Sequence, residues 1–172
     1  IWGNKNSILT GDYLLSRCFE IMVEDGSLEV LKLLSSVSSE IAQGEILQLQ
    51  HEKEIETLEK TYLEIIGSKT SSLFAAAMRV GGCINDKSKN EKEALTSFGA
   101  NFGVCFQITD DILDYYSDNI SFGKKIGNDF YEGKVTLPVI MLYQKSSEAE
   151  RLHLKKMFRA NERTKEELSY TL

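Results

Sequence analysis

Proline is nearly absent from this chain of 172 residues, which contains only Pro138. At the usual frequency of about 5%, roughly eight prolines would be expected. Because proline breaks helices, its scarcity favours long uninterrupted helices. The chain also lacks an excess of basic residues, since 20 lysines and arginines face 26 aspartates and glutamates and the formal net charge is −6. This balance argues against binding to nucleic acid or to a membrane surface, because both need a positive field.

Long apolar runs and targeting signals are missing as well. No run approaches the roughly 18 residues needed to span a bilayer, and no signal-peptide pattern opens the chain. We therefore expect a cytoplasmic protein. The three cysteines, Cys18, Cys83 and Cys105, show no CxxC spacing, which predicts reduced and mostly buried thiols. With 42% hydrophobic and 27% charged residues, the composition is typical of one soluble globular domain.

The chain begins Ile1-Trp2-Gly3, and its first methionine is Met22. A complete translation product normally begins with methionine, so we expect that sequence preceding Ile1 is missing.

Apolar residues recur with helical spacing along most of the chain. We expect a first helix over residues 9–23 that ends at Gly26, and a second that begins at Ser27 and continues past Gln48. A short helix is predicted to end at Gly67, with a new helix opening at Ser68.

The longest predicted helix covers residues 91–116. Its Gly99 and Gly103, four residues apart, allow another backbone to come close. Residues 117–134 lack helical periodicity and predict a long, often functional, connection. A helix restarts around Pro138, and residues 147–172 form an amphipathic tail. No strand pattern is found, so the predicted fold class is all-α.

Three aspartates, Asp110, Asp111 and Asp114, fall within about 100° of the circumference of the longest helix. A divalent cation bound by the three carboxylates would offset their mutual repulsion. Oxygen-only ligands suit Mg²⁺, which commonly bridges to substrate phosphates. A solvated acidic face is the alternative. Gln107, three residues before Asp110, would present an amide dipole beside such a site.

Lysines and glycines follow the aspartates closely. Lys124 and Lys134 bracket a glycine-rich stretch, with Lys125 alongside, and Lys69 opens a separate predicted helix, whose N-terminus favours anions. Carboxylates, ammonium groups and a glycine-rich loop together suit a metal–diphosphate complex. Each lysine taken singly is equally consistent with a solvated surface charge.

The segment from Phe106 to Asp114 resembles the second aspartate-rich motif of the trans-polyprenyl diphosphate synthases. Further blocks resemble that family in the same order and with the same spacing, from residue 1 to about residue 158. They are Trp2-Gly3-Asn4, Gly11-Asp12-Tyr13-Leu14-Leu15, Gly44-Glu45 with Gln48, Lys69-Thr70, Gly123-Lys124, Gly127-Asn128-Asp129 and Gly133-Lys134-Val135-Thr136-Leu137-Pro138. The overall pattern is most similar to the long-chain octaprenyl type.

This resemblance implies an isoprenoid-synthase-type helical bundle and a prenyltransferase. In the family, Mg²⁺ ions ionise an allylic diphosphate, and the resulting allyl cation is attacked by the double bond of isopentenyl diphosphate. The resemblance implies a metal site at Asp110, Asp111 and Asp114, in which Asp110 and Asp111 match the metal-binding aspartates and Asp114 completes the motif through water or a lysine. Lys69, Lys124 and Lys134 match residues that contact the diphosphate, while Thr70 and Gln107 match the polar groups that face the cation. It also implies a homodimer, with residues 8–23 as a candidate surface, and membrane contact only through the lipid product.

One departure is large. The family's first aspartate-rich motif lies immediately before the block that begins at Trp2, where this sequence has no residues. We therefore expect a single partial polyprenyl synthase domain over 1–172, incomplete at both ends and inactive on its own. The alternative is a decayed or non-catalytic subunit that needs a partner chain.

Two other helical classes compete. A terpene cyclase would share diphosphate ionisation but is not expected to carry the block from Gly133 to Pro138. A ferritin-like bundle needs two Glu-x-x-His motifs, and this chain offers one, Glu150 to His153, because Gln48 precedes His51.

Overall fold

The computed structural model describes residues 3–116 and 126–172, and every regular element within these two ranges is helical. The prediction of an all-α chain is therefore confirmed. No helix in the described part of the chain is long and apolar enough to cross a membrane. In chain order the elements are α1 (Asn4–Asp25), α2 (Leu28–Gln50), α3 (Glu59–Ile66), the π-helical turn η1 (Gly67–Ser71), α4 (Ser72–Ile84), α5 (Lys89–Asp114), α6 (Asn128–Glu132), α7 (Leu137–Lys145), α8 (Glu148–Arg159) and α9 (Lys165–Thr171).

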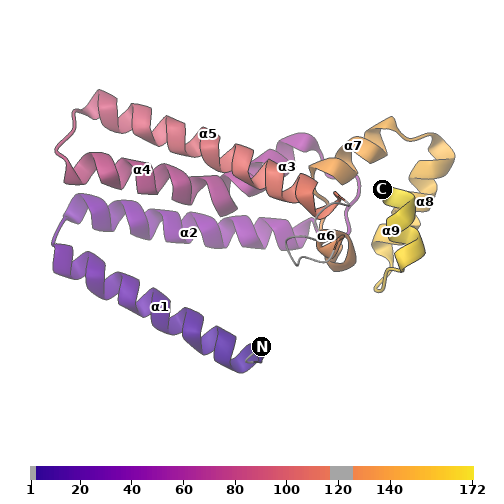
Figure 1. The fold of residues 1–172 in the computed structure, drawn as a ribbon, viewed down its shortest axis with the longest axis horizontal. Helices are drawn as coiled ribbons and strands as arrows, with labels where there is room; N and C mark the ends of the chain where they lie inside the picture. Colours follow the sequence, from indigo (N-terminus) through magenta and orange to yellow (C-terminus); the bar gives the residue numbers. More distant parts are fainter. Residues whose placement is uncertain (1–2, 117–125) are drawn as a thin grey trace.

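The four long helices α1, α2, α4 and α5 form the elongated part of the molecule (Figure 1). The turn between α1 and α2 follows the predicted signals: Gly26 adopts φ 74°, and the Ser27 side chain accepts a hydrogen bond from the backbone of Val30. Left-handed glycines commonly end helices and serines commonly begin them. Both predicted boundaries are confirmed.

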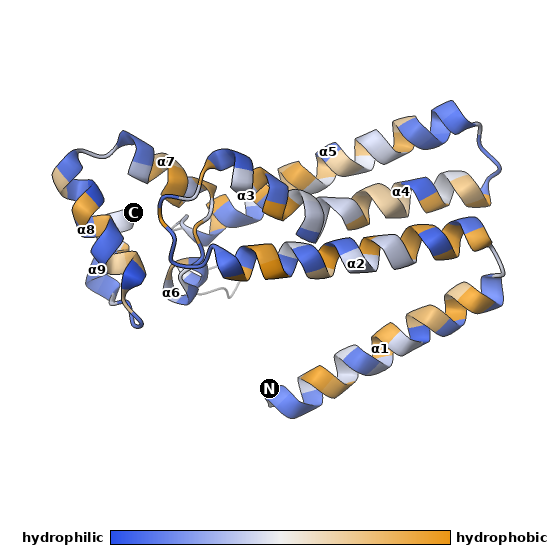
Figure 2. Cartoon of the chain, turned by 180° about the vertical axis from the view of Figure 1, so that it is seen from behind, coloured by the Kyte–Doolittle hydropathy of each residue, from blue (hydrophilic) through white to orange (hydrophobic). Residues whose placement is uncertain are grey.

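Helix α1 diverges from α2 toward its N-terminus (Figure 1), and Met22 is its only buried residue within the described range. Its apolar residues, visible as orange bands in Figure 2, are otherwise open to solvent. The exposed large side chains of α1 are Ile8, Leu9, Tyr13, Leu14, Leu15, Phe19, Ile21 and Val23. An apolar surface of this extent on a helix is typical of an interface.

Helices α4 and α5 pack closely because α5 has two glycines at their contact. A Cβ atom at Gly99 would lie 2.5 Å from the backbone oxygen of Phe74, and one at Gly103 would lie 2.6 Å from the Cα of Ser71. No larger residue fits without moving the backbone. The predicted close approach at Gly99 and Gly103 is confirmed, and it brings α5 against the segment that carries η1.

The predicted break at Gly67 is wrong. Gly67 keeps right-handed helical torsions, φ −58° and ψ −56°, and α3 continues through η1 into α4. Instead of ending at Gly67, the helix widens into a π-helical turn over residues 67–71. Such turns are frequent at functional sites. Lys69 therefore lies within a continuous helix and not at a helix N-terminus.

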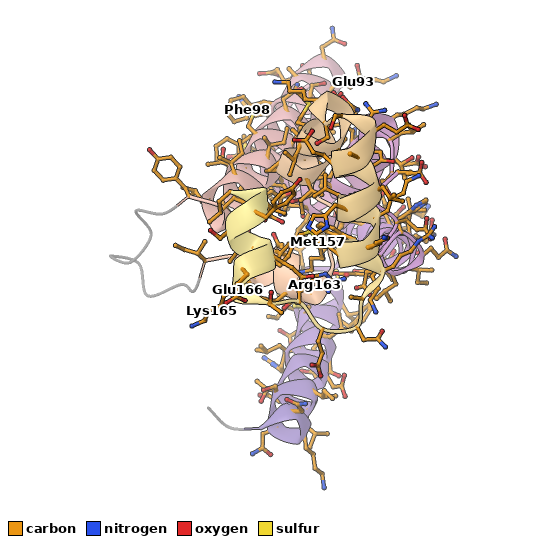
Figure 3. The ribbon with its side chains drawn as sticks, turned by 90° about the vertical axis from the view of Figure 1, so that its right-hand side faces the viewer. Glu93, Phe98, Met157, Arg163, Lys165 and Glu166 are labelled. Carbon is orange, nitrogen blue, oxygen red and sulfur yellow. The ribbon has the colours of Figure 1, made fainter. Side chains whose placement is uncertain are left out.

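The C-terminal helices form the main hydrophobic core. Its buried members are Ile55, Phe130, Val139, Leu154, Met157, Phe158 and Leu168. In Figure 3, Met157 and Arg163 are labelled between α8 and α9. Arg163 is 8% exposed and donates hydrogen bonds to the backbone oxygens of Phe158 and Tyr131. The guanidinium thus ties these helices to α6.

The predicted connection over residues 117–134 contains the short helix α6, which the sequence prediction missed. Residues 117–125 lie outside the described part of the chain. The helix predicted to restart near Pro138 is confirmed as α7, which begins after Thr136. The amphipathic tail divides into α8 and α9, each begun by a capping box.

The expectation that the thiols are mostly buried is wrong. Cys18 and Cys105 are exposed, and Cys83 is half-buried. Cys18 lies on the open side of α1, and Cys105 lies on α5 beside the exposed ring of Phe106. No described helix covers either side chain.

Candidate active site

A cavity of about 240 Å³ lies where the ends of α2 and α5 meet α3, η1 and the segment after α6. It is lined by Gln48, His51, Glu52, Tyr62, Ile65, Ile66, Lys69, Gln107, Asp110, Asp111, Asp129, Lys134, Val135 and Thr136. Among these described residues, four carboxylates face two ammonium groups. The cavity therefore combines groups that attract a cation with groups that bind an anion.

Asp110 and Asp111 reach this cavity from the last turns of α5. Asp110 is half-exposed, whereas Asp111 is only 3% exposed. The Tyr62 hydroxyl donates a hydrogen bond of 2.7 Å to Asp111 Oδ2, and Gln107 Nε2 donates one of 2.8 Å to Oδ1. Both oxygens of the buried carboxylate thus have protein donors, as buried charged groups require.

Burial shifts the ionisation of this pair. It raises the pKa of Asp111 to about 6, against the hydrogen bonds from Tyr62 and Gln107, and the negative charges of Asp129 and Asp110 act in the same direction as burial. Burial also raises the pKa of Tyr62 far above its ordinary value, and the neighbouring Asp111 adds to this shift. The phenol therefore remains protonated as a donor.

Asp114 does not line the cavity. It is 7% exposed, and its two carboxylate oxygens accept hydrogen bonds from the backbone nitrogens of Asn128 and Asp129, at 3.2 and 2.9 Å. These nitrogens belong to the first turn of α6, where backbone donors lack helical partners. Asp114 therefore fixes the segment that leads to Lys134.

Lys69 enters the cavity from the π-helical turn. Its Nζ donates a hydrogen bond of 2.6 Å to Gln48 Oε1 and lies 3.1 Å from Glu45 Oε1. This contact requires α2 to approach η1 closely: a Cβ atom at Gly44 would lie 2.7 Å from the Lys69 backbone nitrogen. Glu45 and Gln48 thus hold the Lys69 ammonium group, and Gly44 allows α2 to come close enough for these contacts.

Thr70, the next residue of the turn, contacts α5. Its hydroxyl donates a hydrogen bond of 2.8 Å to Gln107 Oε1. Because Gln107 Nε2 donates to Asp111, the amide is held at both ends. The structure therefore brings together Thr70 and Gln107, both of which match cation-facing groups of the family, and their dipoles lie beside the Asp111 carboxylate.

Lys134 lines the cavity from the segment between α6 and α7. Its Nζ lies 3.2 Å from Asp129 Oδ1 and 2.6 Å from Glu132 Oε2. Burial acts to lower the pKa of Lys134, but the hydrogen bond to Glu132 and the charge of Asp129 outweigh it and raise the pKa above its ordinary value. The Lys134 side chain therefore stays protonated and positively charged at neutral pH. Lys124, the other predicted lysine of this region, lies outside the described residues.

The residues present suit Mg²⁺ only in part. Asp110 and Asp111 supply the carboxylate oxygens that Mg²⁺ prefers. Within residues 3–116 and 126–172, however, no group of three or more histidines, cysteines, aspartates or glutamates is arranged to hold a metal ion. A Mg²⁺ ion here would complete its shell with water and with oxygens of an anionic ligand, which is how this ion is commonly bound.

Comparison with known proteins decides the family. The family model described as polyprenyl synthetase matches residues 1–172. The chain belongs to the polyprenyl synthetase family. It is 43% identical over 150 residues to the all-trans-nonaprenyl-diphosphate synthase (geranyl-diphosphate specific) of Rhodobacter capsulatus, a match that covers 87% of this chain and 46% of that protein.

Two further relatives agree. The octaprenyl diphosphate synthase of Escherichia coli (strain K12) is 40% identical over 139 residues, covering 81% of this chain and 43% of that protein. The crystal structure of a polyprenyl synthase from Caulobacter crescentus CB15, complexed with calcium and isoprenyl diphosphate, superposes with a TM-score of 0.93 at 38% identity, covering 99% of this chain and 52% of that one. The chain spans about half the length of the relatives it matches. The predicted family and isoprenoid-synthase-type fold are confirmed.

The candidate site also includes residues that the sequence prediction left without a role. Asp129 was part of a recognised block, but its ion pair with Lys134 depends on the turn at Gly133. Tyr62 precedes Lys69 by two helical turns. This spacing, which places both on one helical face, is the only local sign in the sequence that Tyr62 belongs to the site. His51 and Glu52 line the cavity and gave no signal in the sequence.

Proposed function

We propose that this chain supplies the diphosphate-ionising half of a polyprenyl diphosphate synthase, which adds isopentenyl diphosphate to an allylic diphosphate. The observation that carries the proposal is the convergence of Asp110 and Asp111 with Lys69 and Lys134 around one cavity. The relative from Caulobacter crescentus was solved with calcium and isoprenyl diphosphate. This chain shares its fold, so the same pairing of a divalent ion with a diphosphate is the natural ligand for the cavity.

The lysines bind the diphosphate. Lys69 and Lys134 both line the cavity, Lys69 from η1 and Lys134 from the segment after α6. Lys124 is proposed as a third contact from the segment before α6. Lys69 is held by Gln48 and Glu45, and Lys134 by Asp129 and Glu132. Ammonium groups fixed before the ligand arrives stabilise developing negative charge without reorganising.

The aspartates bind the metal. Asp110 is the more accessible carboxylate, and Asp111 keeps lone pairs beyond those used by Tyr62 and Gln107. Asp114, the third predicted metal residue, is proposed to contribute by holding the α6 segment in place. Bound Mg²⁺ would supply charge neutralisation for the leaving diphosphate.

Thr70 and Gln107 are proposed to face the allyl cation. Their side-chain oxygens are 2.8 Å apart and joined by a hydrogen bond, and each retains lone pairs. Dipoles of this kind stabilise a positive charge without forming a bond to it.

In the proposed reaction the bond between the allylic carbon and the diphosphate oxygen breaks, and the diphosphate leaves with the electron pair. The double bond of isopentenyl diphosphate then attacks the allyl cation and forms a carbon–carbon bond. The released diphosphate, or a group near it, takes the proton that restores the double bond. The names of the two curated relatives, an octaprenyl and a nonaprenyl diphosphate synthase, support a long-chain product.

A homodimer is proposed for the complete protein, with the exposed apolar side of α1 as the shared surface. We propose no nucleic-acid partner, a cytoplasmic location, and membrane contact only through the lipid product.

The test measures incorporation of radiolabelled isopentenyl diphosphate onto farnesyl diphosphate by the natural polypeptide that contains these residues. With Mg²⁺ present, Asp110→Ala is expected to remove most of the activity and to weaken the dependence on Mg²⁺. Unchanged turnover of the Asp110→Ala variant would reject the metal role.

The 172-residue chain is assayed in parallel, alone and mixed with the remaining half of the Rhodobacter capsulatus relative. Product that forms only in the mixture would show that this chain needs residues of the other half to complete the site. Product from the 172-residue chain alone would show that this chain carries the complete site.

A further inference from the structure

The proposed reaction assigns no role to Tyr62, yet its hydroxyl lies in the middle of the site. Tyr62 is 3% exposed and lines the cavity. Its Oη lies 2.7 Å from Asp111 Oδ2, across a sequence separation of 49 residues. The other oxygen of the same carboxylate accepts the Gln107 amide at 2.8 Å. The Asp111 carboxylate is therefore held from two helices, α3 and α5.

Both donors are themselves held in place. The Tyr62 side chain packs in a buried cluster with Ile66 and Ile140. The Gln107 amide oxygen accepts the hydroxyl of Thr70 at 2.8 Å. Tyr62 and Thr70 belong to one continuous helical stretch, so two of the hydrogen bonds from that stretch to α5 lead to Asp111. The two contacts meet at a single carboxylate.

We propose that Tyr62 is a positioning residue, which holds the Asp111 carboxylate so that Asp111 and Gln107 keep one orientation toward a bound metal–diphosphate. The inference rests on the proposed function and extends it to a side chain that acts through Asp111. Hydrogen bonds to metal-binding carboxylates fix their orientation, and their loss commonly weakens metal binding about 10- to 100-fold. Tyr62 has the geometry of such a partner.

A purely structural tyrosine is the competing explanation, and the chain provides a matched control for it. Tyr143 also donates its hydroxyl to a carboxylate, Glu56 Oε1 at 3.3 Å, and packs against the C-terminal core. It does not line the cavity. Tyr62→Phe and Tyr143→Phe therefore remove the same atom and the same kind of hydrogen bond, one inside the site and one away from it.

The experiment titrates Mn²⁺ into the 172-residue chain with inorganic diphosphate present, and measures free Mn²⁺ by electron paramagnetic resonance. Tyr62→Phe is expected to weaken Mn²⁺ binding about 10-fold or more, while Tyr143→Phe stays within about twofold of the unmodified chain. Thermal unfolding without metal or diphosphate measures the structural cost of each variant separately. Equal Mn²⁺ binding by Tyr62→Phe and the unmodified chain overturns the inference, as does equal weakening by both variants.

A rescue variant keeps the test decisive if Tyr62→Phe does not fold. Tyr62→4-aminophenylalanine restores a hydrogen-bond donor at the same ring position, and is expected to bind Mn²⁺ within about threefold of the unmodified chain. A folded rescue variant that still binds at least tenfold more weakly overturns the inference. If the unmodified chain binds no Mn²⁺ with diphosphate, the proposed function fails, which is a different result from a failure of Tyr62.

Discussion

The carboxylate of Asp114, near the end of α5, accepts a hydrogen bond of 2.9 Å from the backbone nitrogen of Asp129, in the first turn of α6. The main-chain oxygen of Asp114 also accepts the backbone nitrogen of Gly127 at 2.8 Å. The third aspartate of the motif is thus a cap for the next helix. It couples the end of α5 to the segment that carries Asp129 and Lys134.

Replacing this cap should lower stability more than the removal of an exposed aspartate. Loss of an N-cap typically costs about 0.5–2 kcal/mol, and we expect Asp114→Ala to fall near the upper end because the carboxylate is buried. Urea denaturation followed by circular dichroism measures this cost. Asp12→Ala, an exposed position on α1, is the control and should change little. Equal midpoints for the two variants would contradict the capping role.

Gly44 should tolerate no larger residue, because a Cβ atom there would lie 2.7 Å from the Lys69 backbone nitrogen. Overpacking of this kind costs about 1–3 kcal/mol, and it would also displace Lys69 from Gln48. We expect Gly44→Ala to lower the unfolding midpoint and to weaken binding of inorganic diphosphate.

Gly81 provides the opposite case. It lies within α4, and nothing comes within 4 Å of a Cβ atom added there. Since alanine is favoured over glycine inside helices by up to about 1 kcal/mol, Gly81→Ala should stabilise the chain. A Gly44→Ala variant as stable as Gly81→Ala would show that the contact between α2 and η1 is loose.

Magnesium should bind to this chain together with diphosphate and hardly at all without it. Of the four carboxylates that line the cavity, Asp110 and Asp111 are the proposed metal ligands, and the described residues offer no group of three metal-binding side chains, so the ligand must complete the metal shell. Isothermal titration calorimetry with Mg²⁺, in the presence and absence of inorganic diphosphate, measures this coupling. Asp110→Ala should abolish the coupled binding, and Asp12→Ala should preserve it. Tight Mg²⁺ binding without diphosphate would refute the arrangement.

Much of the fold follows from local signals in the sequence. Gly26 and Ser27 mark a helix boundary by backbone torsion and capping, both of which depend on a few neighbouring residues. The aspartates of α5 share a helical face because their spacing fixes their angle. Gly99 and Gly103 indicated close packing because only small residues allow it.

The sequence failed where distant contacts decide the structure. Gly67 resembled a helix end, but packing of the following residues against α2 and α5 favours a continuous helix with a π-helical turn. The hydrogen bond between Tyr62 and Asp111 spans 49 residues, so no local pattern indicates it. The hydrogen bonds from the backbone of Asn128 and Asp129 to Asp114 likewise depend on where α6 lies, and no local pattern indicates them.

Cysteine labelling tests the proposed dimer surface. Cys18 and Cys105 are exposed, whereas burial and the neighbouring Glu29 raise the pKa of Cys83. In dilute protein at neutral pH, Cys18 and Cys105 should react first with a thiol reagent. Cys83 should react slowly and accelerate only at higher pH, because a raised pKa lowers the thiolate fraction. Peptide mass spectrometry assigns each site.

Increasing the protein concentration should then protect Cys18 selectively, because it lies among the exposed apolar residues of α1. Cys105, on α5, serves as the internal control and should keep its rate. Sedimentation velocity at the same concentrations reports the mass of the species present. If a dimer forms while the Cys18 rate stays constant, the two copies associate through a surface other than α1. If Cys18 is protected in step with dimer formation, the apolar side of α1 is the shared interface.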